Sequence, residues 1–120
     1  MTPHELAEAL AVRLDDVVPD GLRVRADGER VVVLRGDQVL GASAAPRIID
    51  GDTSGRQLAT ATYATINAVQ DVVAEELTTP WPARSRGMPH PQARLDGRML
   101  YAWFGPAERP VLALRPLDIG

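Results

Sequence analysis

The chain contains no cysteine and no lysine. Without cysteine it can form no disulfide, no thiolate zinc site and no cysteine nucleophile. Without lysine it has no lysine phosphate loop, no Schiff-base chemistry and no lysine general base. All 13 basic residues are arginine. This bias, with abundant alanine, valine, aspartate, glycine and proline, indicates a high-GC bacterial genome of actinobacterial-like composition.

Histidines and long apolar runs are scarce as well. His4 and His90 are the only imidazoles, so we expect no metal site and no cofactor. No run of about eighteen apolar residues could span a membrane, and the N-terminus lacks the pattern of a signal peptide. The formal net charge of −3 argues against a nucleic-acid-binding or membrane-binding surface. We therefore expect a cytoplasmic protein that binds neither.

The length and the hydrophobic content fit a single domain over residues 1–120. The 120 residues, 45% of them hydrophobic, suffice for one core but not for two. The first helix is expected over residues 3–18, because Thr2 and Glu5 form a capping box at its start. Residues 21–44 alternate with a period of two. They predict strands at 21–26, 30–35 and 38–44, joined by hairpin turns at Asp27-Gly28 and Gly36-Asp37.

The second half of the chain repeats this order. A long helix is expected over residues 55–77, ended by Pro80, and three more strands follow, with turns at Asp96-Gly97 and Gly105-Pro106. The sequence thus predicts an α+β fold, helix–three strands–helix–three strands, with an antiparallel sheet packed against a long central helix. An internal duplication relating residues 1–46 to residues 54–117 is one explanation of this order; hairpin turn chemistry alone is the other.

The long helix carries no charged residue from Gln57 to Gln70. A solvent-facing helix of this length ordinarily carries several charges, so we expect this one to be covered on more than one side. One of its faces has mostly small side chains, which suits the close approach of another helix. The predicted homodimer interface on this face consists of Ala61, Ala64, Ala68 and Val72. The alternative is that its own domain covers the whole helix.

The stretch "IIDGDTSGRQLATA", residues 48–61, has the polar residues of a ligand loop. A calcium loop starting at Asp50 would need a glutamate at its last position, which is Ala61. A phosphate loop would need Gly-Lys-Ser/Thr, which is absent. The better interpretation is a helix start, with Ser54 as the N-cap and Gln57 reaching back to it. A weaker anion site at the same helix start is the alternative.

The segment "TTPWPARSRGMPHPQ", residues 78–92, is the stronger candidate for a binding site. Its four prolines make it stiff, and it is longer than a routine connection. The predicted ligand- or partner-binding residues of this proline-rich arm are Trp81, Arg84, Arg86 and His90. Arginines held on a rigid arm beside an aromatic ring suit a carboxylate, a phosphate or an acidic peptide. In the alternative interpretation Trp81 plugs the end of the core, and the arm is surface packing or disorder.

Three further features bear on function. His90 could act as a general base at neutral pH, but no serine or carboxylate stands in a triad-like relation to it, and we assign no catalytic residue. Trp103 and Phe104 follow one another on a strand and therefore point to opposite faces. The outward ring would favour an interface, and the sequence does not decide which ring it is. Residues 81–120 hold six arginines against three acids, which favours a basic C-terminal face.

The order of elements resembles the type III secretion chaperone-like fold. The resemblance covers most of the chain, by order and not by a sequence motif, and a predicted sixth strand stands where that family has a C-terminal helix. Members of the family are small, acidic, dimeric α+β proteins that bind partner polypeptides. Because the predicted sixth strand replaces that helix, the family's chaperone function is not carried over to this chain.

Three functions from different classes fit these features. The first is a non-enzymatic protein-interaction module, adaptor-like or chaperone-like, that acts as a homodimer and presents a sheet face or the proline-rich arm to an unidentified protein. The second is a small anionic-ligand-binding domain that uses the loop at residues 84–90. The third is an enzyme that uses His90 with a distant carboxylate. The lack of a catalytic constellation and the uncharged helix favour the first.

Overall fold

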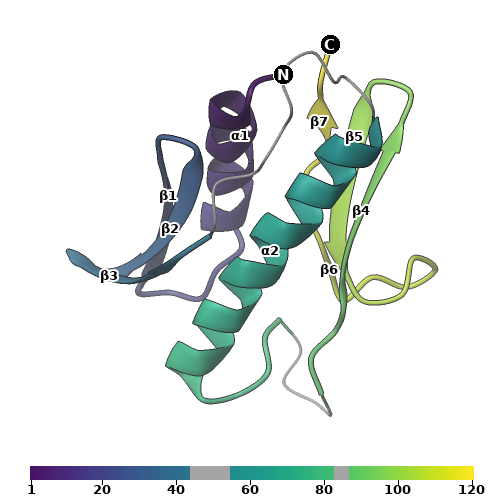
Figure 1. The fold of residues 1–120 in the computed structure, drawn as a ribbon. Helices are drawn as coiled ribbons and strands as arrows, with labels where there is room; N and C mark the ends of the chain where they lie inside the picture. Colours follow the sequence, from purple (N-terminus) through teal and green to yellow (C-terminus); the bar gives the residue numbers. More distant parts are fainter. Residues whose placement is uncertain (44–54, 83–86) are drawn as a thin grey trace.

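The computed structural model describes residues 1–43, 55–82 and 87–120. In this part of the chain it has two helices and two antiparallel sheets, which confirms the predicted α+β class (Figure 1). The elements in chain order are α1 (Pro3–Asp15), β1 (Leu22–Asp27), β2 (Arg30–Arg35), β3 (Gln38–Ala42), α2 (Gly55–Leu77), β4 (Pro91–Asp96), β5 (Met99–Phe104), β6 (Leu112–Ala113) and β7 (Leu117–Asp118).

The first helix begins at the predicted capping box. The Thr2 hydroxyl accepts a hydrogen bond from the Glu5 N–H at 3.1 Å, and the Glu5 carboxylate accepts one from the Thr2 N–H at 3.1 Å. The helix ends at Asp15, earlier than predicted. The N–H groups of the two valines that follow both return to the Leu14 carbonyl, and Pro19 disfavours helical backbone in the residue before it.

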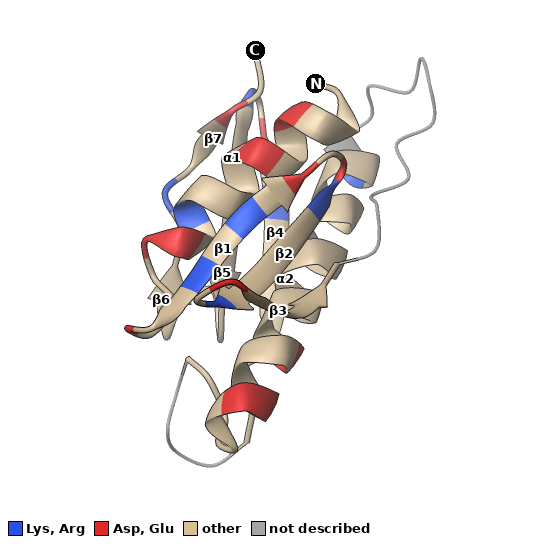
Figure 2. Ribbon diagram, turned by 90° about the vertical axis from the view of Figure 1, so that its left-hand side faces the viewer, with Lys and Arg blue, Asp and Glu red and all other residues tan. Residues whose placement is uncertain are grey.

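The second helix has the predicted bounds and lies between the two sheets. Its middle turns carry no charged side chain, and acidic residues appear only towards its C-terminal end (Figure 2). It packs chiefly on β4 and also contacts β2, β3 and β5. The helix is therefore covered on two sides by its own domain, which accounts for much of the uncharged run. Its buried residues are Leu58, Ala61, Thr62, Thr65, Ile66, Val69, Gln70 and Val73.

Sheet A (β1–β3) and sheet B (β4–β7) together contain three hairpins with two-residue loops. In sheet B, β5 pairs with β4 on one side and with both β6 and β7 on the other. Each of the three hairpin loops begins with a glycine of positive φ: Gly28, Gly36 and Gly97. Glycine in the first loop position is typical of type II′ turns. Asp27 and Asp96 stay in their strands, so two of the loops begin one residue later than predicted.

One hydrophobic core joins the helices to both sheets. The apolar stripe of α1 packs on β1 and β2, and the inward-facing residues of β5 reach α2 from the other side (Figure 1). The predicted last strand is present as β6, and β7 continues the same edge beyond Pro116. This arrangement leaves the face of sheet B that points away from α2 without a covering helix in the described part of the chain.

Candidate interaction surface on sheet B

The proline-rich arm is joined to the core near both of its ends. Trp81 is 6% exposed, and its ring packs edge-to-face on Phe104 with the centroids 5.4 Å apart. The Gln70 side chain, which is also buried, donates hydrogen bonds to the carbonyl oxygens of Trp81 at 3.1 Å and Pro89 at 2.6 Å. Trp81 therefore lies in the core, as in the alternative interpretation of the sequence, and its predicted role in binding a partner at the surface is wrong.

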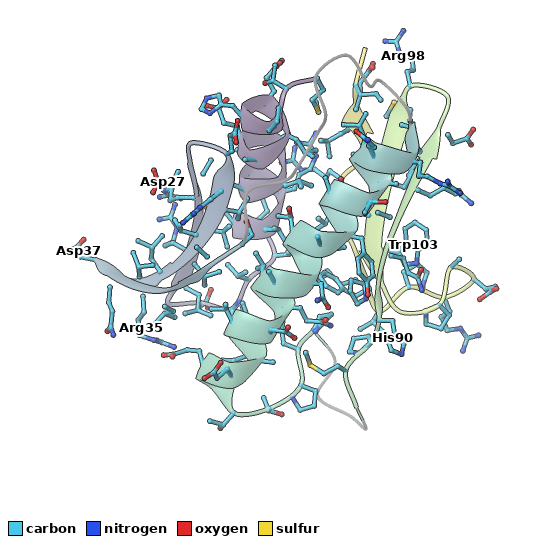
Figure 3. The ribbon with its side chains drawn as sticks, in the orientation of Figure 1. Asp27, Arg35, Asp37, His90, Arg98 and Trp103 are labelled. Carbon is cyan, nitrogen blue, oxygen red and sulfur yellow. The ribbon has the colours of Figure 1, made fainter. Side chains whose placement is uncertain are left out.

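The remaining residues predicted on the arm are placed only in part. Arg84 and Arg86 lie outside the described residues, and their role stays a prediction. His90 is exposed and directly precedes β4 (Figure 3). Its carbonyl accepts a hydrogen bond from the Gly105 N–H at 2.8 Å. Within the described ranges no carboxylate or hydroxyl hydrogen-bonds to its ring, so the geometry here gives an enzymatic role of His90 no support.

The four predicted homodimer residues of α2 lie on different surfaces. Ala61 is buried in its own domain, Ala68 and Val72 are half-buried, and Ala64 is exposed. Val72 faces β3 at Gly41, where an added Cβ would lie only 2.6 Å from Val72 Cγ2. The small-residue face thus packs partly on sheet A, and only Ala64 of the four is fully available to a second chain.

The polar stretch at residues 48–61 is described only from residue 55 onward, so the predicted cap at Ser54 lies outside the described residues. Arg56, in the first turn of α2, is exposed. Across residues 1–43, 55–82 and 87–120, no three His, Asp or Glu side chains are grouped so that they could hold a metal ion. In the same ranges no helix is long and apolar enough to cross a membrane.

The outer face of sheet B, which points away from α2, gathers exposed aromatic and charged side chains. Burial alternates along β5, so that Phe104 is buried and Trp103 is half-exposed. The structure thereby decides which of the two adjacent rings points outward. Tyr101 points the same way as Trp103, and so do the exposed residues of β4, which are Gln92, Arg94 and Asp96.

Arg94 extends from β4 over the two aromatic rings of β5. Its Cζ atom lies 5.8 Å from the Tyr101 ring centroid and 6.0 Å from the Trp103 ring centroid, which is within the range of cation–π attraction. Arg94 and Tyr101 are direct cross-strand partners. The Trp103 indole N–H donates to the Gly105 carbonyl at 3.1 Å, which fixes the ring. These three side chains, Arg94, Tyr101 and Trp103, form the Arg94 cluster.

A hollow of about 210 Å³ lies beside the Arg94 cluster. Apart from Arg94 and the two rings, its lining is apolar: Ala102, Ala107, Pro110, Ala113 and Leu114. Pockets that enclose a drug-sized ligand have volumes of roughly 300–1,000 Å³. The hollow is therefore suited to one or two side chains of a partner rather than to a whole cofactor.

Several arginines already form ion pairs with carboxylates of the same chain. Arg23 and Arg25 bind Asp15, and Arg98 binds Asp118. Hydrogen bonds from Arg23 lower the pKa of the Asp15 carboxyl, and those from Arg98 lower the pKa of the Asp118 carboxyl. Arg94 differs, because no ion pair or hydrogen bond of its side chain is found in the described part of the chain. Its charge is available to an incoming acid.

The comparisons with known proteins add no relative to this picture. No protein-family model, no curated protein sequence and no solved structure was found to match this chain.

Proposed function

We propose that this chain is a non-enzymatic protein-interaction module of the bacterial cytoplasm, and that its contact surface is the outer face of sheet B around the Arg94 cluster. The observation that carries the proposal is the Arg94 guanidinium, which lies over two half-exposed rings and has no acidic partner among the described residues. Arginine, tyrosine and tryptophan are the residues that most often dominate the binding energy of protein interfaces.

The shape of the surface supports a polypeptide partner. The hollow beside the cluster is apolar, small and open, so it would take a side chain of a partner while Arg94 binds a neighbouring carboxylate. The rings are held by strand pairing and by the Trp103 hydrogen bond, and little side-chain freedom would be lost on binding.

A peptide-display selection tests this function. Random peptides are selected on the wild-type protein, and their affinities are then measured for the Arg94→Ala variant and for the Arg30→Ala variant. Arg30 is the matched control, because it is an exposed arginine on sheet A that has no ion pair in the described part of the chain. We expect Arg94→Ala to weaken binding by about tenfold or more, as loss of a charged hydrogen-bonding group does, and Arg30→Ala to leave binding unchanged.

Two outcomes would count against the proposal. Selected peptides that bind wild type and Arg94→Ala equally well would place the contact elsewhere. A protein that selects no peptide, but is stabilised against heat by small carboxylates or phosphates, would favour the alternative of a small anionic-ligand-binding domain that uses residues 84–90. The same thermal measurement on Arg94→Ala would show whether the ligand involves the cluster.

The proposal includes the homodimer expected from the sequence. The exposed part of the uncharged run on α2 offers Thr60, Tyr63 and Ala64 to a second copy, and the Tyr63 side chain is 45% exposed. Sedimentation velocity over a range of protein concentrations tests for this homodimer. The variant Ala64→Arg places a charge in the predicted homodimer interface. A dimer that this substitution dissociates is expected. A monomer at all concentrations would remove self-association from the proposal and leave the Arg94 cluster unaffected.

A further inference from the structure

Strand β4 is an edge strand whose outward backbone groups are open. Among the described strands it pairs with β5 alone. Successive residues of an antiparallel strand direct their N–H and C=O groups alternately to the partner and away from it. The Gly105 N–H donates to the His90 carbonyl, so the even-numbered residues of β4 bond to β5. The N–H and C=O groups of Ala93 and Leu95 therefore point outward, and in the described part of the chain no hydrogen bond reaches them.

Other strand edges are closed by side chains of the same chain. On β1, the Val24 N–H donates to the Asp15 carboxylate at 2.9 Å. Beside β6 and β7, the Arg13 side chain donates to the carbonyl oxygens of Arg115 at 2.8 Å and Pro116 at 3.1 Å. Strand β3 runs on towards residues 44–54, which lie outside the described residues. An open edge is a template for an added strand, and natural proteins commonly block one as β1 is blocked.

A groove of about 420 Å³ follows this open edge between β4 and α2. Its lining residues are Arg56, Ala59, Ala93, Arg94, Leu95 and Gly97. Among the residues that the structure describes, no acidic side chain lines it. Arg56 and Arg94 are both exposed, and neither has an ion pair within residues 1–43, 55–82 and 87–120. The groove therefore combines unsatisfied strand groups, a small apolar floor at Ala59 and two uncompensated positive charges.

We infer that this groove binds an extended acidic segment of a partner protein, which adds to the edge of β4 as a further strand. The inference rests on the proposed function, because it names the partner class for the same side of sheet B. Main-chain hydrogen bonds to Ala93 and Leu95 supply affinity in this mode of recognition, and alternate side chains supply specificity. The two arginines select acidic residues on the added strand.

The pairing geometry fixes where the acidic residues must lie. Arg94 directs its backbone groups to β5, so the residue of the added strand that faces Arg94 stands in a non-hydrogen-bonded pair, with the Cα atoms roughly 4.5 Å apart. A glutamate or aspartate there reaches the Arg94 guanidinium. Neighbouring residues of the added strand point to the α2 side, where Ala59 leaves room for a small apolar side chain and Arg56 is within the same groove.

A second copy of this chain suits the edge less well than an acidic segment. Joining two copies through this groove would bring together two sets of Arg56 and Arg94 side chains, and like charges that face each other across strands are destabilising. Edge strands commonly use charge in this way against self-pairing. The same two charges attract an acidic strand.

The test uses two blocked hexapeptides, one of alternating Glu and Val and one of alternating Lys and Val. Amide hydrogen exchange and chemical shifts of the wild-type protein are followed by NMR during titration. We expect the Glu–Val peptide to bind at least about tenfold more tightly than the Lys–Val peptide, since the charge that faces Arg94 changes sign. We also expect it to slow exchange of the Ala93 and Leu95 amides, which point to solvent in the free protein.

Two variants isolate the backbone and the charge contributions. Ala93→Pro removes an outward N–H without removing a bond to β5, as Pro91 already does at the same edge, and we expect it to weaken Glu–Val binding about tenfold. Arg56→Glu/Arg94→Glu should reverse the preference towards the Lys–Val peptide, which no loss of folding could imitate. Arg30→Glu/Arg109→Glu has the same net charge, alters exposed arginines that do not line the groove, and should keep the preference for Glu–Val.

Several results would contradict the inference, and each can be told apart from failure of the proposed function. Equal affinity for both peptides, or no binding of either at millimolar concentration, would overturn the inference. So would Ala93 and Leu95 amides that are already protected in the free protein, whether by a second copy or by the chain itself. Shifts confined to Tyr101 and Trp103, with no protection on β4, would overturn strand addition and leave the proposed function standing. Display-selected peptides that ignore Arg94 would instead remove the proposed function.

Discussion

Gln70 shows how one buried polar residue can organise two distant backbone segments. Its amide lies within α2 and donates to the carbonyl oxygens of Trp81 and Pro89, on either side of residues 83–86. A buried carbonyl that loses its donor costs about 1–3 kcal/mol. The sequence marks this position only as the end of an uncharged run, because nothing local indicates a partner eleven residues away.

The first prediction concerns this side chain. Gln70→Leu keeps the volume but removes both donors, and we expect the free energy of unfolding to fall by about 2–3 kcal/mol. Urea unfolding followed by tryptophan fluorescence measures the change. Asn67→Ala, one turn earlier on the same helix, is the control and should change stability by less than about 0.5 kcal/mol. Equal effects of the two substitutions would mean that the Gln70 hydrogen bonds contribute little.

The second prediction concerns the residue that ends α2. Thr78 has a φ of 55°, a left-handed backbone that costs an L-residue about 1–2 kcal/mol. The Thr79 N–H bonds back to the Ala74 carbonyl at 3.2 Å, so the position is that of a helix C-cap, where glycine is preferred. We expect Thr78→Gly to raise the melting temperature and to add about 0.5–1 kcal/mol of stability. Thr79→Gly, where φ is negative, should lower the melting temperature. A loss of stability in both variants would mean that the left-handed backbone at Thr78 costs little.

At the scale of elements, the packing of α2 against β3 depends on a missing side chain. Gly41 allows Val72 to approach the strand, and a Cβ there would lie 2.6 Å from Val72 Cγ2 and 3.3 Å from Cγ1. Valine is stiff at χ1, so it cannot rotate away without strain. The helix would have to move from the sheet, and α2 could then no longer contact both sheets as it does here.

The third prediction follows from this contact. Gly41→Ala should destabilise the protein by about 1–3 kcal/mol through overpacking. Combining it with Val72→Ala should recover part of that loss, giving a coupling energy of about 1 kcal/mol in a double-mutant cycle measured by urea unfolding. Combination with Val39→Ala, which alters an exposed side chain of the same strand, should be additive. Full additivity at Val72 would show that the helix moves freely.

The helices and hairpins could be predicted because their sequence signals are local. The Arg94 cluster could not be predicted, because it depends on the register of pairing between β4 and β5. The capping box placed the start of α1, and Pro80 marked the end of α2 within a few residues. The Asp-Gly pairs marked hairpins, but a loop at Asp96-Gly97 would set Arg94 opposite Met99. The observed loop begins at Gly97 and sets Arg94 opposite Tyr101. A loop that begins one residue later thus shifts the cross-strand partner of Arg94 by two residues and brings Arg94 opposite an aromatic ring.

The open edge of β4 could not be predicted for a different reason. An edge is a property of the order of strands in a sheet. The sequence contains no signal that closes the outer edge of β1 with Asp15 while leaving the outer edge of β4 open in the described part of the chain. The proline-rich arm was predicted to be a binding site because of its composition. The structure places one of its four candidate residues, Trp81, in the core, and composition could not separate that role from a surface one.

At the scale of the whole molecule, two carboxylates connect segments that are separate in the fold, and a third closes a helix cap. Asp15 joins the end of α1 to β1, Asp118 joins β7 to the β4–β5 turn through Arg98, and Glu5 closes the N-terminal cap. Hydrogen bonds from Arg23, from Arg98 and from the Thr2 backbone, respectively, are the largest causes that lower the pKa of these three carboxyls. All three shifts have the same sign.

The fourth prediction is therefore a loss of stability in acid. A carboxyl whose pKa is lower in the folded state than in the unfolded chain stabilises the fold fully above the unfolded pKa, near 4 for these groups. That stability is lost as the pH falls through the folded pKa, because the unfolded chain then binds more protons. We expect the urea midpoint to stay constant from about pH 7 to about pH 5 and to fall steadily below about pH 4.

Asp15 is the group that isolates this effect, because its carboxylate is the most buried of the three and accepts hydrogen bonds from Arg23, Arg25 and the Val24 N–H. At neutral pH, Asp15→Asn should lower stability by about 1.5–3 kcal/mol, the usual contribution of hydrogen bonds to a charged group. The difference from wild type should shrink as the pH falls, since the wild-type carboxylate is then protonated as well. Asp37→Asn, at the exposed tip of the β2–β3 turn (Figure 3), should change stability by less than about 0.5 kcal/mol. A difference between wild type and Asp15→Asn that is the same at pH 7 and at pH 3 would show that shape, not charge, holds α1 to sheet A.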